Sequence, residues 1–311
     1  MKLNEKLLTK TYAVVLLSLF CCFLWGSSAP GVKLGYEFFS IPETDNLGHI
    51  LFAGIRFTMA GVLTIVFGSL LNGKMLVPKK SSIKMVLAIS LFQIIIQETL
   101  FCIGVAVTPG STASILNGLS VFATLIFSAA VFKLEKITRN KAIGCLLGFI
   151  GIVILNLNGD FKLSFSYGEV LLIIGIISCA FSTVLLKVYS VYENPVTLTG
   201  WQFLFGGLVL MTFAYIAGGR ISPTGTGSYL IMLYLAFLSA AAFSIWGILL
   251  RFNPMSRISV FSFAQPIFGV VLSIVLLSDR VDIPRCLTAL VFVCAGIFLV
   301  NRTVVREENE K

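Results

Sequence analysis

The amino-acid sequence predicts an all-α integral membrane protein of ten transmembrane helices, arranged as two inverted five-helix repeats. Composition is the first reason: of the 311 residues, 57% are hydrophobic and only 12% are charged, and the mean hydropathy is +0.98. A soluble domain carries about 25% charged residues, so this chain has too little polar surface to cover a core in water. Its apolar runs are continuous over about 20 residues, which favours helices over barrel strands.

Ten apolar runs are the second reason, because each is long enough to be a candidate membrane span. They cover residues 12–33, 47–71, 84–106, 111–132, 141–157, 167–188, 197–217, 228–250, 256–278 and 284–301. The loops between them are short, so we expect consecutive helices to be antiparallel neighbours. Residues 1–311 are therefore predicted to form a single transmembrane domain whose first span is not cleaved.

Similarity between the two halves is the third reason. Residues 12–157 and 167–301 align at an offset of about 145 residues. The matching positions are Asn117, Ser120, Thr124 and Ser128 with Ser262, Gln265, Gly269 and Ser273, Arg56 and Gly61 with Gln202 and Gly207, and 151–156 with 296–301. Each half has five spans, an odd number, so the second half starts on the opposite side of the membrane. Inverted repeats of this kind are a recurrent design of secondary transporters.

The basic residues predict the orientation of the spans. With the N-terminus inside, the inner segments contain 17 of the 23 lysine and arginine residues, whereas the outer segments contain five. Cytoplasmic loops of membrane proteins carry such an excess. We therefore expect a multi-pass protein of the plasma (inner) membrane of a prokaryote, with both termini in the cytoplasm. The net charge of +9 is explained in this way, and no nucleic-acid partner is expected.

Residues within and directly after several spans carry a resemblance to a known family. They are Trp25 and Lys33 in the first span, Arg56-Phe57 in the second, Glu135 after the fourth, Lys187 closing the sixth, Gln265-Pro266 in the ninth, and Asp279-Arg280 after it. With its glycine-rich fifth and tenth spans, the sequence resembles the drug/metabolite transporter superfamily, EamA type. The resemblance implies export or exchange of small metabolites through a central cavity lined by spans one, three, four, six, eight and nine. Val121, which stands where the ninth span has Pro266, departs from the pattern, as does a long first outer loop.

Arg56 and Glu98 are the most informative polar residues. Ionisable side chains within a span are costly and usually face a cavity. Counted along their helices from the outer ends, both lie roughly 12–14 Å deep, near the middle of the bilayer. We hypothesise that they pair or share a substrate, and that Glu98 is the candidate for proton coupling. A purely structural ion pair between packed helices is the alternative.

Other polar side chains extend this candidate substrate site. Gln93 and Gln97 lie four residues apart on the third span, so they share a face. The stripes of the fourth and ninth spans add Asn117 and Ser120, and Ser262 and Gln265. Interhelical hydrogen bonds and close helix packing are the alternatives for these residues. Pro266 cannot donate a hydrogen bond to the carbonyl of residue 262, which predicts a kink beside the site and a role in gating.

Aromatic and basic residues near the span ends allow two interpretations each. Trp25 lies two-thirds along the first span and is a candidate hydrophobic wall of the site. Lys33 and Lys187 end the first and sixth spans on opposite sides of the membrane, so they are candidate gates or simply snorkel to the interface. Trp201 and Trp246 are expected to be interfacial anchors.

Two features are expected to have no part in transport. His49, the single histidine, is predicted to lie at the surface, at the outer mouth of the second span. Gly144, Gly148 and Gly151 form a small-residue face, which packs within the bundle or forms a dimer interface.

Taken together, these features predict a secondary transporter that exports or exchanges small metabolites, such as amino acids or their derivatives, by alternating access. A carrier for drugs or toxic compounds, or a channel, is the alternative. The spans lack the residue sets of an intramembrane enzyme and of a metal site, and no nucleotide-binding loop is present, so we expect no enzyme activity and no cofactor. The expected partners are the substrate, membrane lipids and, if Glu98 couples to them, protons. The protein is expected to be a monomer or a weak homodimer.

Overall fold

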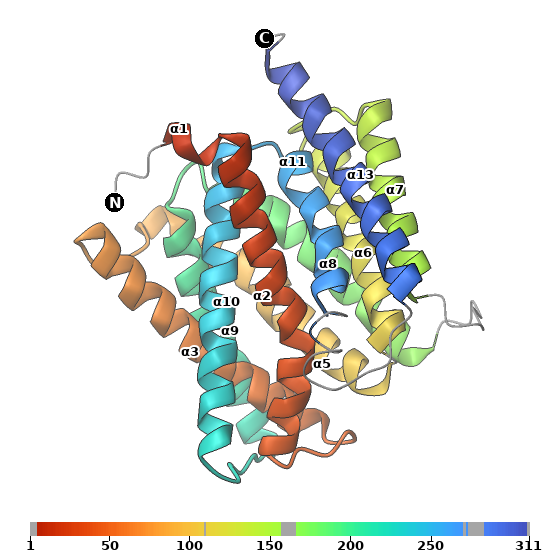
Figure 1. The fold of residues 1–311 in the computed structure, drawn as a ribbon. Coiled ribbons are helices and arrows are strands. Elements are labelled where there is room, and N and C mark those ends of the chain that lie inside the picture. Colours follow the sequence, from red (N-terminus) through yellow and green to blue (C-terminus); the bar gives the residue numbers. More distant parts are fainter. Residues whose placement is uncertain (1–4, 109, 157–165, 270–271, 273–282, 310–311) are drawn as a thin grey trace.

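Helices make up all the regular secondary structure in the described residues of the computed structural model, which are 5–108, 110–156, 166–269, 272 and 283–309 (Figure 1). Six helical runs in this part of the chain are long and apolar enough to cross a membrane. They are α2 (Thr11–Phe38), α3 (Asn46–Asn72), the run Lys80–Val107, α8 (Tyr167–Tyr189), α9 (Pro195–Ile216) and α10 (Thr226–Phe252). The chain is therefore a multi-pass, all-helical membrane protein.

Further helices complete the bundle. They are α1 (Glu5–Leu8), α6 (Gly110–Ile126) with η3 (Phe127–Val131), α7 (Arg139–Asn156), α11 (Met255–Ser259) with η4 (Val260–Ala264), and α13 (Ile283–Asn309). Each of the ten expected spans overlaps a helix, although the ninth is described only to Gly269 and at Leu272. Ser273 and Asp279-Arg280 lie outside the described residues.

Local sequence signals explain where several helices begin and end. The Asp45 carboxylate accepts a hydrogen bond of 2.8 Å from the Gly48 amide at the start of α3, and the Asn194 side chain accepts one of 2.8 Å from the Val196 amide at the start of α9. Both contacts satisfy amide groups that have no partner within the helix. Gly73 ends α3 with a φ of 64°, in the left-handed region that favours glycine.

The third and ninth spans contain irregular turns. In the run Lys80–Val107, the π-helical segment η2 (Leu91–Ile96) separates α4 (Ile83–Ser90) from α5 (Gln97–Val107). The Ser178 hydroxyl of α8 donates a 2.6 Å hydrogen bond to the Phe92 carbonyl within that segment. In the ninth span, the 3-10 segment η4 ends directly before Gln265-Pro266, where a proline removes one helical hydrogen bond.

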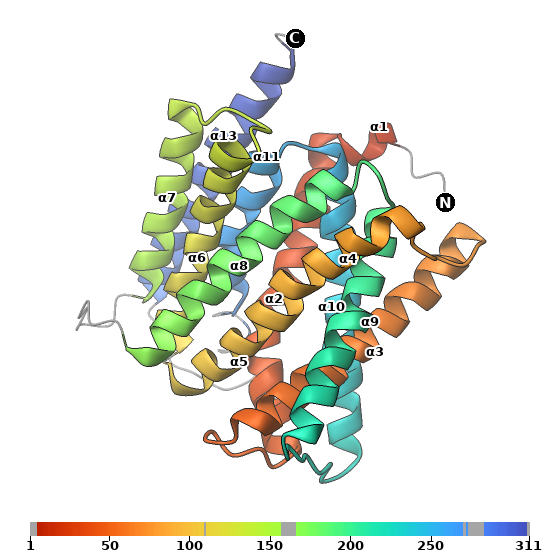
Figure 2. The ribbon, with the colours of Figure 1, turned by 180° about the vertical axis from the view of Figure 1, so that it is seen from behind.

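Both ends of the described part of the chain lie on one side of the bundle, the upper side in Figure 1, which we call the terminal face. α1 and the end of α13 lie there, as do the end of α10 and the start of α11. Figure 2 shows the other side of the bundle, where α8 runs along α4 and α5 and where α9 packs against α3, α4 and α10.

Glycines bring two pairs of helices into backbone contact. A Cβ on Gly61 of α3 would overlap the backbone of α9 at Leu204, and one on Gly207 of α9 would overlap the backbone of α3 at Thr58. Between α7 and α13, a Cβ on Gly296 would lie 2.5 Å from the Gly144 carbonyl oxygen, and one on Gly151 would lie 2.8 Å from that of Ala289. These are close van der Waals seams of the kind that hold membrane helices together.

This packing decides one open alternative and corrects one expectation. The glycine face of α7 is covered by α13 and by the Phe263 ring, against which a Cβ on Gly148 would clash, so it is not available for a dimer. His49 is fully buried rather than exposed, because its ring stacks on Tyr36 with the ring centroids 4.3 Å apart. His49 was expected to be exposed because it lies near the start of the second span. However, α2 continues to Phe38, and its Tyr36 ring covers His49.

Candidate substrate cavity

A cavity of about 190 Å³ lies inside the bundle, between α2, α3, the η2–α5 segment, α6, α8, α10 and the α11–η4 segment. The cavity is lined by all nine residues that were predicted from the sequence to bind substrate: Trp25, Arg56, Gln93, Gln97, Glu98, Asn117, Ser120, Ser262 and Gln265. They come from five expected spans that are far apart in the sequence. Their role in binding stays a prediction, but the fold brings them to one place.

Arg56 and Glu98 form an ion pair in this cavity. Arg56 Nη2 lies 2.9 Å from Glu98 Oε2, and the two side chains are only 7% and 8% exposed. The Arg56 guanidinium also lies 4.4 Å from the centroid of the neighbouring Phe57 ring. Arg56 therefore adds the second span to the six that the family resemblance implies.

Gln93 is tied into the wall by an amide contact. The Gln202 side chain donates a 2.8 Å hydrogen bond from Nε2 to Gln93 Oε1, and both residues are buried. Gln202 is the position that aligns with Arg56 in the second half of the chain. This hydrogen bond joins α9 to the π-helical segment, so Gln93 both lines the cavity and holds the helices together.

Several buried polar atoms of the lining residues have no hydrogen-bond partner within the described part of the chain. They include Trp25 Nε1 and Arg56 Nε, which are donors, and Gln97 Oε1, which is an acceptor. Leaving such groups without a partner in an apolar interior is costly. A polar ligand or water that enters the cavity can satisfy them.

Aromatic rings form one wall of the cavity. Trp25 meets Phe243 edge-on with the ring centroids 5.1 Å apart, and Trp246 with the centroids 4.9 Å apart. Trp246 is buried and lines the cavity, so its expected role as an interfacial anchor is wrong. Trp201, by contrast, donates a 2.7 Å hydrogen bond from Nε1 to the Leu76 carbonyl, near the ends of α9 and α3.

The family resemblance implies that the sixth span, α8, lines the cavity, but the sequence reasoning named none of its lining residues. Ile176, Cys179, Ala180 and Thr183 of α8 all line the cavity. Their spacing of three, one and three residues places them on one helical face, which is the signal that could have found them. The face carries no charge or amide, so it did not stand out from the lipid-facing residues of the same span.

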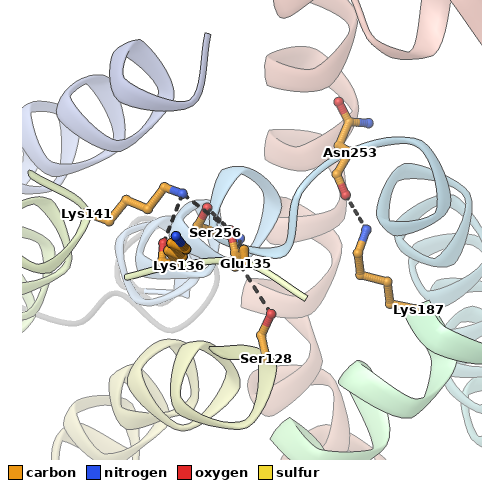
Figure 3. Close-up of polar contacts among 7 residues, drawn as sticks. All are labelled: Ser128, Glu135, Lys136, Lys141, Lys187, Asn253 and Ser256. Carbon is orange, nitrogen blue, oxygen red and sulfur yellow. Dashed lines mark hydrogen bonds and ion pairs between the residues drawn. The ribbon is translucent and has the colours of Figure 1, made fainter. Parts of the chain in front are cut away.

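The expected gating residues lie outside the cavity lining. Pro266 is buried directly after η4 and beside Gln265. Lys33 is exposed and has no hydrogen bond or ion pair with any described residue. Lys187 is half-buried, and its Nζ donates a hydrogen bond of 2.6 Å to the Leu250 carbonyl at the end of α10. It donates a second, of 2.5 Å, to the Asn253 carbonyl (Figure 3).

Glu135 makes a second contact of this kind at the terminal face. Its carboxylate accepts hydrogen bonds of 2.8 Å from the Ser256 amide and 2.6 Å from the Ser256 hydroxyl, at the start of α11. Lys141 Nζ lies 3.6 Å from the same carboxylate, and the Ser128 hydroxyl donates to it at 3.3 Å (Figure 3). We call the Lys187 and Glu135 contacts the terminal latches. Both join chain segments within one helical turn of cavity-lining residues, Leu186 and Ser259.

Comparisons with known proteins identify the class. The chain matches the model of the EamA-like transporter family over residues 12–157 and 166–302, and it belongs to that family. An uncharacterized transporter of Archaeoglobus fulgidus is 25% identical over 282 residues, which cover 89% of this chain and 95% of that protein. The uncharacterized inner membrane transporter YedA of Escherichia coli is 28% identical over 263 residues, 80% of this chain and 78% of YedA.

Comparison with solved structures supports the fold. One crystal structure superposes with a TM-score of 0.71 at 18% identity, over 93% of this chain and 98% of that chain. At this level of identity the likeness concerns the fold alone. The family consists of transporters rather than enzymes, so membrane transport is the general activity of this protein.

Proposed function

We propose that the protein is a secondary transporter that moves a small zwitterionic metabolite, an amino acid or a derivative of one, across the plasma membrane. One observation carries the proposal: a single ion pair, Arg56–Glu98, lies in a small interior cavity with an aromatic wall. An ion pair presents one positive and one negative group side by side. A zwitterion matches both groups and leaves no net charge in the low-dielectric interior.

Recognition follows from the atoms that the cavity presents. The substrate carboxylate would bind the Arg56 guanidinium, whose Nε has no partner among the described residues, and the substrate ammonium would bind Glu98. Trp25 Nε1 and Gln97 Oε1 supply one further donor and one acceptor. The ring edges of Phe243 and Trp246 would contact an apolar substrate side chain.

The transport cycle we propose uses ten spans as two inverted five-helix repeats. Gly61 and Gly207, which align in the sequence, make equivalent contacts across α3 and α9. Gly151 of α7 and Gly296 of α13 also align in the sequence. A Cβ on Gly151 would contact Ala289 of α13, and one on Gly296 would contact Gly144 of α7. In alternating access, the two halves exchange such equivalent packing contacts around one site.

The terminal face is cytoplasmic in this proposal, because the basic residues predict both termini inside. The terminal latches then close the cytoplasmic path in the conformation described here. Lys33, near the opposite end of α2, ends the first span as Lys187 ends the sixth, and it is exposed. We propose that it makes the corresponding closing contact when the terminal latches open, and that Pro266 lets the ninth span bend.

Proton coupling is proposed for Glu98. Its charged form is held by one salt bridge with Arg56 and is otherwise surrounded by the bundle interior. When the substrate carboxylate takes over Arg56, that salt bridge weakens and Glu98 can accept a proton or the substrate ammonium. The proton and the substrate ammonium thus compete for Glu98. This competition allows export in exchange for protons, and it also allows exchange of one substrate molecule for another.

Counterflow in proteoliposomes tests the proposal. Vesicles loaded with unlabelled amino acids should accumulate the corresponding labelled one transiently, as a carrier does and a channel does not. Arg56→Gln and Glu98→Gln should each lower the rate at least about tenfold, since each removes a charge-assisted hydrogen bond to substrate. Arg220→Gln is the matched control, because Arg220 lies outside the cavity, where it donates hydrogen bonds to the Tyr215 and Gly219 carbonyls and lies over the Tyr215 ring.

The aromatic wall favours a second candidate, a carrier for lipophilic drugs. The cavity of about 190 Å³ argues against it, because sites for drug-sized ligands measure about 300–1,000 Å³. Efflux of a cationic dye that continues in Arg56→Gln, together with no counterflow of any amino acid, would replace the first proposal by this one.

A further inference from the structure

A second crevice, larger than the substrate cavity, lies between α3 and α10 on the outside of the bundle. Its volume is about 710 Å³, and it shares no lining residue with the substrate cavity. Most of its wall comes from one face of α3, including Leu63, Phe67 and Leu71, and from the facing side of α10. The proposed transport cycle assigns no role to it.

The crevice is apolar along its length and polar at one end. Two polar residues lie along its walls, Thr64, which donates a hydrogen bond to the Ala60 carbonyl of its own helix, and Ser244. The other polar lining residues are at the terminal face, where α3 and α10 end and α9 begins: Asn72, Arg251 and Asn194.

Arg251 is the one cationic residue that lines the crevice. Its side chain is exposed, and no hydrogen bond or ion pair joins it to any residue in the described ranges. Its guanidinium carbon lies 5.6 Å from the centroid of the Phe252 ring. An uncompensated positive charge therefore stands at the mouth of an apolar crevice.

The crevice has the depth and opening of a lipid site. From Phe237 to Arg251 the lining of α10 extends roughly 21 Å, and from Leu63 to Asn72 that of α3 extends roughly 14 Å, at 1.5 Å per residue. One leaflet of a bilayer has a hydrocarbon depth of roughly 15 Å. Phe67 and Phe237 are 54% and 51% exposed, so the crevice opens sideways, where acyl chains lie.

We propose that this crevice binds an anionic phospholipid of the leaflet at the terminal face. An acyl chain lies between α3 and α10, and the headgroup phosphate accepts hydrogen bonds from Arg251. The apolar walls select a hydrocarbon chain rather than a polar ligand, and the unpaired guanidinium selects a headgroup of net negative charge. Because α3 belongs to the N-terminal half of the chain and α10 to the C-terminal half, the lipid bridges the two halves.

Native mass spectrometry of the detergent-purified protein tests this site. Phosphatidylglycerol and phosphatidylcholine with the same acyl chains are added in equal amounts, and the retained lipid is counted. We expect preferential retention of phosphatidylglycerol, reduced about fivefold in Arg251→Gln with phosphatidylcholine unchanged. Ala241→Phe, which fills the crevice from α10, should lower the retention of both lipids. Arg302→Gln removes an exposed charge from α13, on the far side of the bundle, and should change neither.

Three outcomes would overturn the proposal. One is equal retention of the two lipids by the wild-type protein. Another is an equal loss in Arg251→Gln and Arg302→Gln, which would indicate general attraction to the basic surface. The third is a homodimer in light scattering that Ala241→Phe dissociates, since the crevice would then be covered by a second copy of the chain. If Ala241→Phe does not fold, Ser244→Leu narrows the same crevice with a smaller side chain.

Discussion

At the scale of single residues, the stability of the protein depends on how its buried charges are paired. Arg56 and Glu98 are both within the bundle, and their ion pair brings two costly groups together. Removal of one partner leaves the other charge buried and unpaired, which is more costly than removal of both.

A double-mutant cycle measures this coupling. Arg56→Gln and Glu98→Gln should each lower the free energy of unfolding by about 3–5 kcal/mol, whereas the double variant should lose less than either. The melting temperatures of the purified variants, measured in the same detergent, give the order of their stabilities. If the double variant loses as much stability as the two single variants added together, the two charges act independently.

The sequence nominated the cavity residues that carry charge, amides or hydroxyls, because such groups are conspicuous in an apolar span. It missed Ile176 and Ala180, and it missed the burial of Trp246, because apolar side chains are suited equally to lipid and to protein contact. Cys179 and Thr183 were missed for a related reason, since small residues also serve helix packing.

At the scale of elements, the irregular turns and the latches shape the site. The π-helical segment η2 directly precedes Gln97 and Glu98, and π-bulges are frequent at functional sites. The terminal latches connect the ends of separate helices through side-chain contacts to backbone groups. Elements joined in this way can separate without disturbing their own helical hydrogen bonds.

Glu135→Gln should open the latch at α11. The variant loses a charged hydrogen bond of about 1.5–3 kcal/mol, so the terminal side should open at least about tenfold more often. A cysteine at Ser259, in a protein without other cysteines, should then react faster with an impermeant maleimide from that side.

Glu169→Gln is the matched control for this experiment. Glu169 also accepts a backbone hydrogen bond at a helix end, that of the Ser166 amide, but it lies at the start of α8 rather than at the latch. Equal labelling rates in the two variants would remove Glu135 from the gate.

Glu193 gives a pH-dependent contact between loops. Partial burial alone would raise the pKa of this carboxyl, but hydrogen bonds from the Lys79 and Asn194 amides, together with the Lys79 charge, hold its pKa below the ordinary value. Because the pKa is lower in the folded state, its contribution to stability is present above the unfolded pKa of about 4.3 and is lost as the pH falls through the folded value.

The measurement is the difference in melting temperature between wild type and Glu193→Gln. The wild type should melt higher at neutral pH, and the difference should shrink below about pH 4. A difference that is constant across this range would show that the charge of Glu193 is not the stabilising feature.

At the scale of the whole molecule, glycines let the two halves approach closely where α3 meets α9. Gly61 and Gly207 allow α3 and α9 to approach until their backbones touch. Equivalent glycines in equivalent contacts are expected if the halves are repeats, so substitutions in either half should have matching effects.

Gly61→Ala and Gly207→Ala should each destabilise the protein by about 1–3 kcal/mol, because a Cβ forces the two backbones apart. Melting temperature and counterflow rate check this, with Gly227→Ala as the control, where a Cβ would lie 3.4 Å from the Phe38 ring in ordinary contact. A severe effect in one variant and none in the other would argue against equivalent roles.

By itself the sequence determined the class of protein, the helical spans and the residues able to interact with a polar substrate. These properties depend on composition and on short-range periodicity, which survive without knowledge of the fold. Only the tertiary structure decided how each helix is rotated about its axis. It buried His49 and Trp246, joined Arg56 to Glu98, turned one face of α8 toward the cavity and paired Glu135 with Ser256. In a bilayer both surroundings of a helix are apolar, so the hydrophobic pattern does not say which face is inward, and packing decides it.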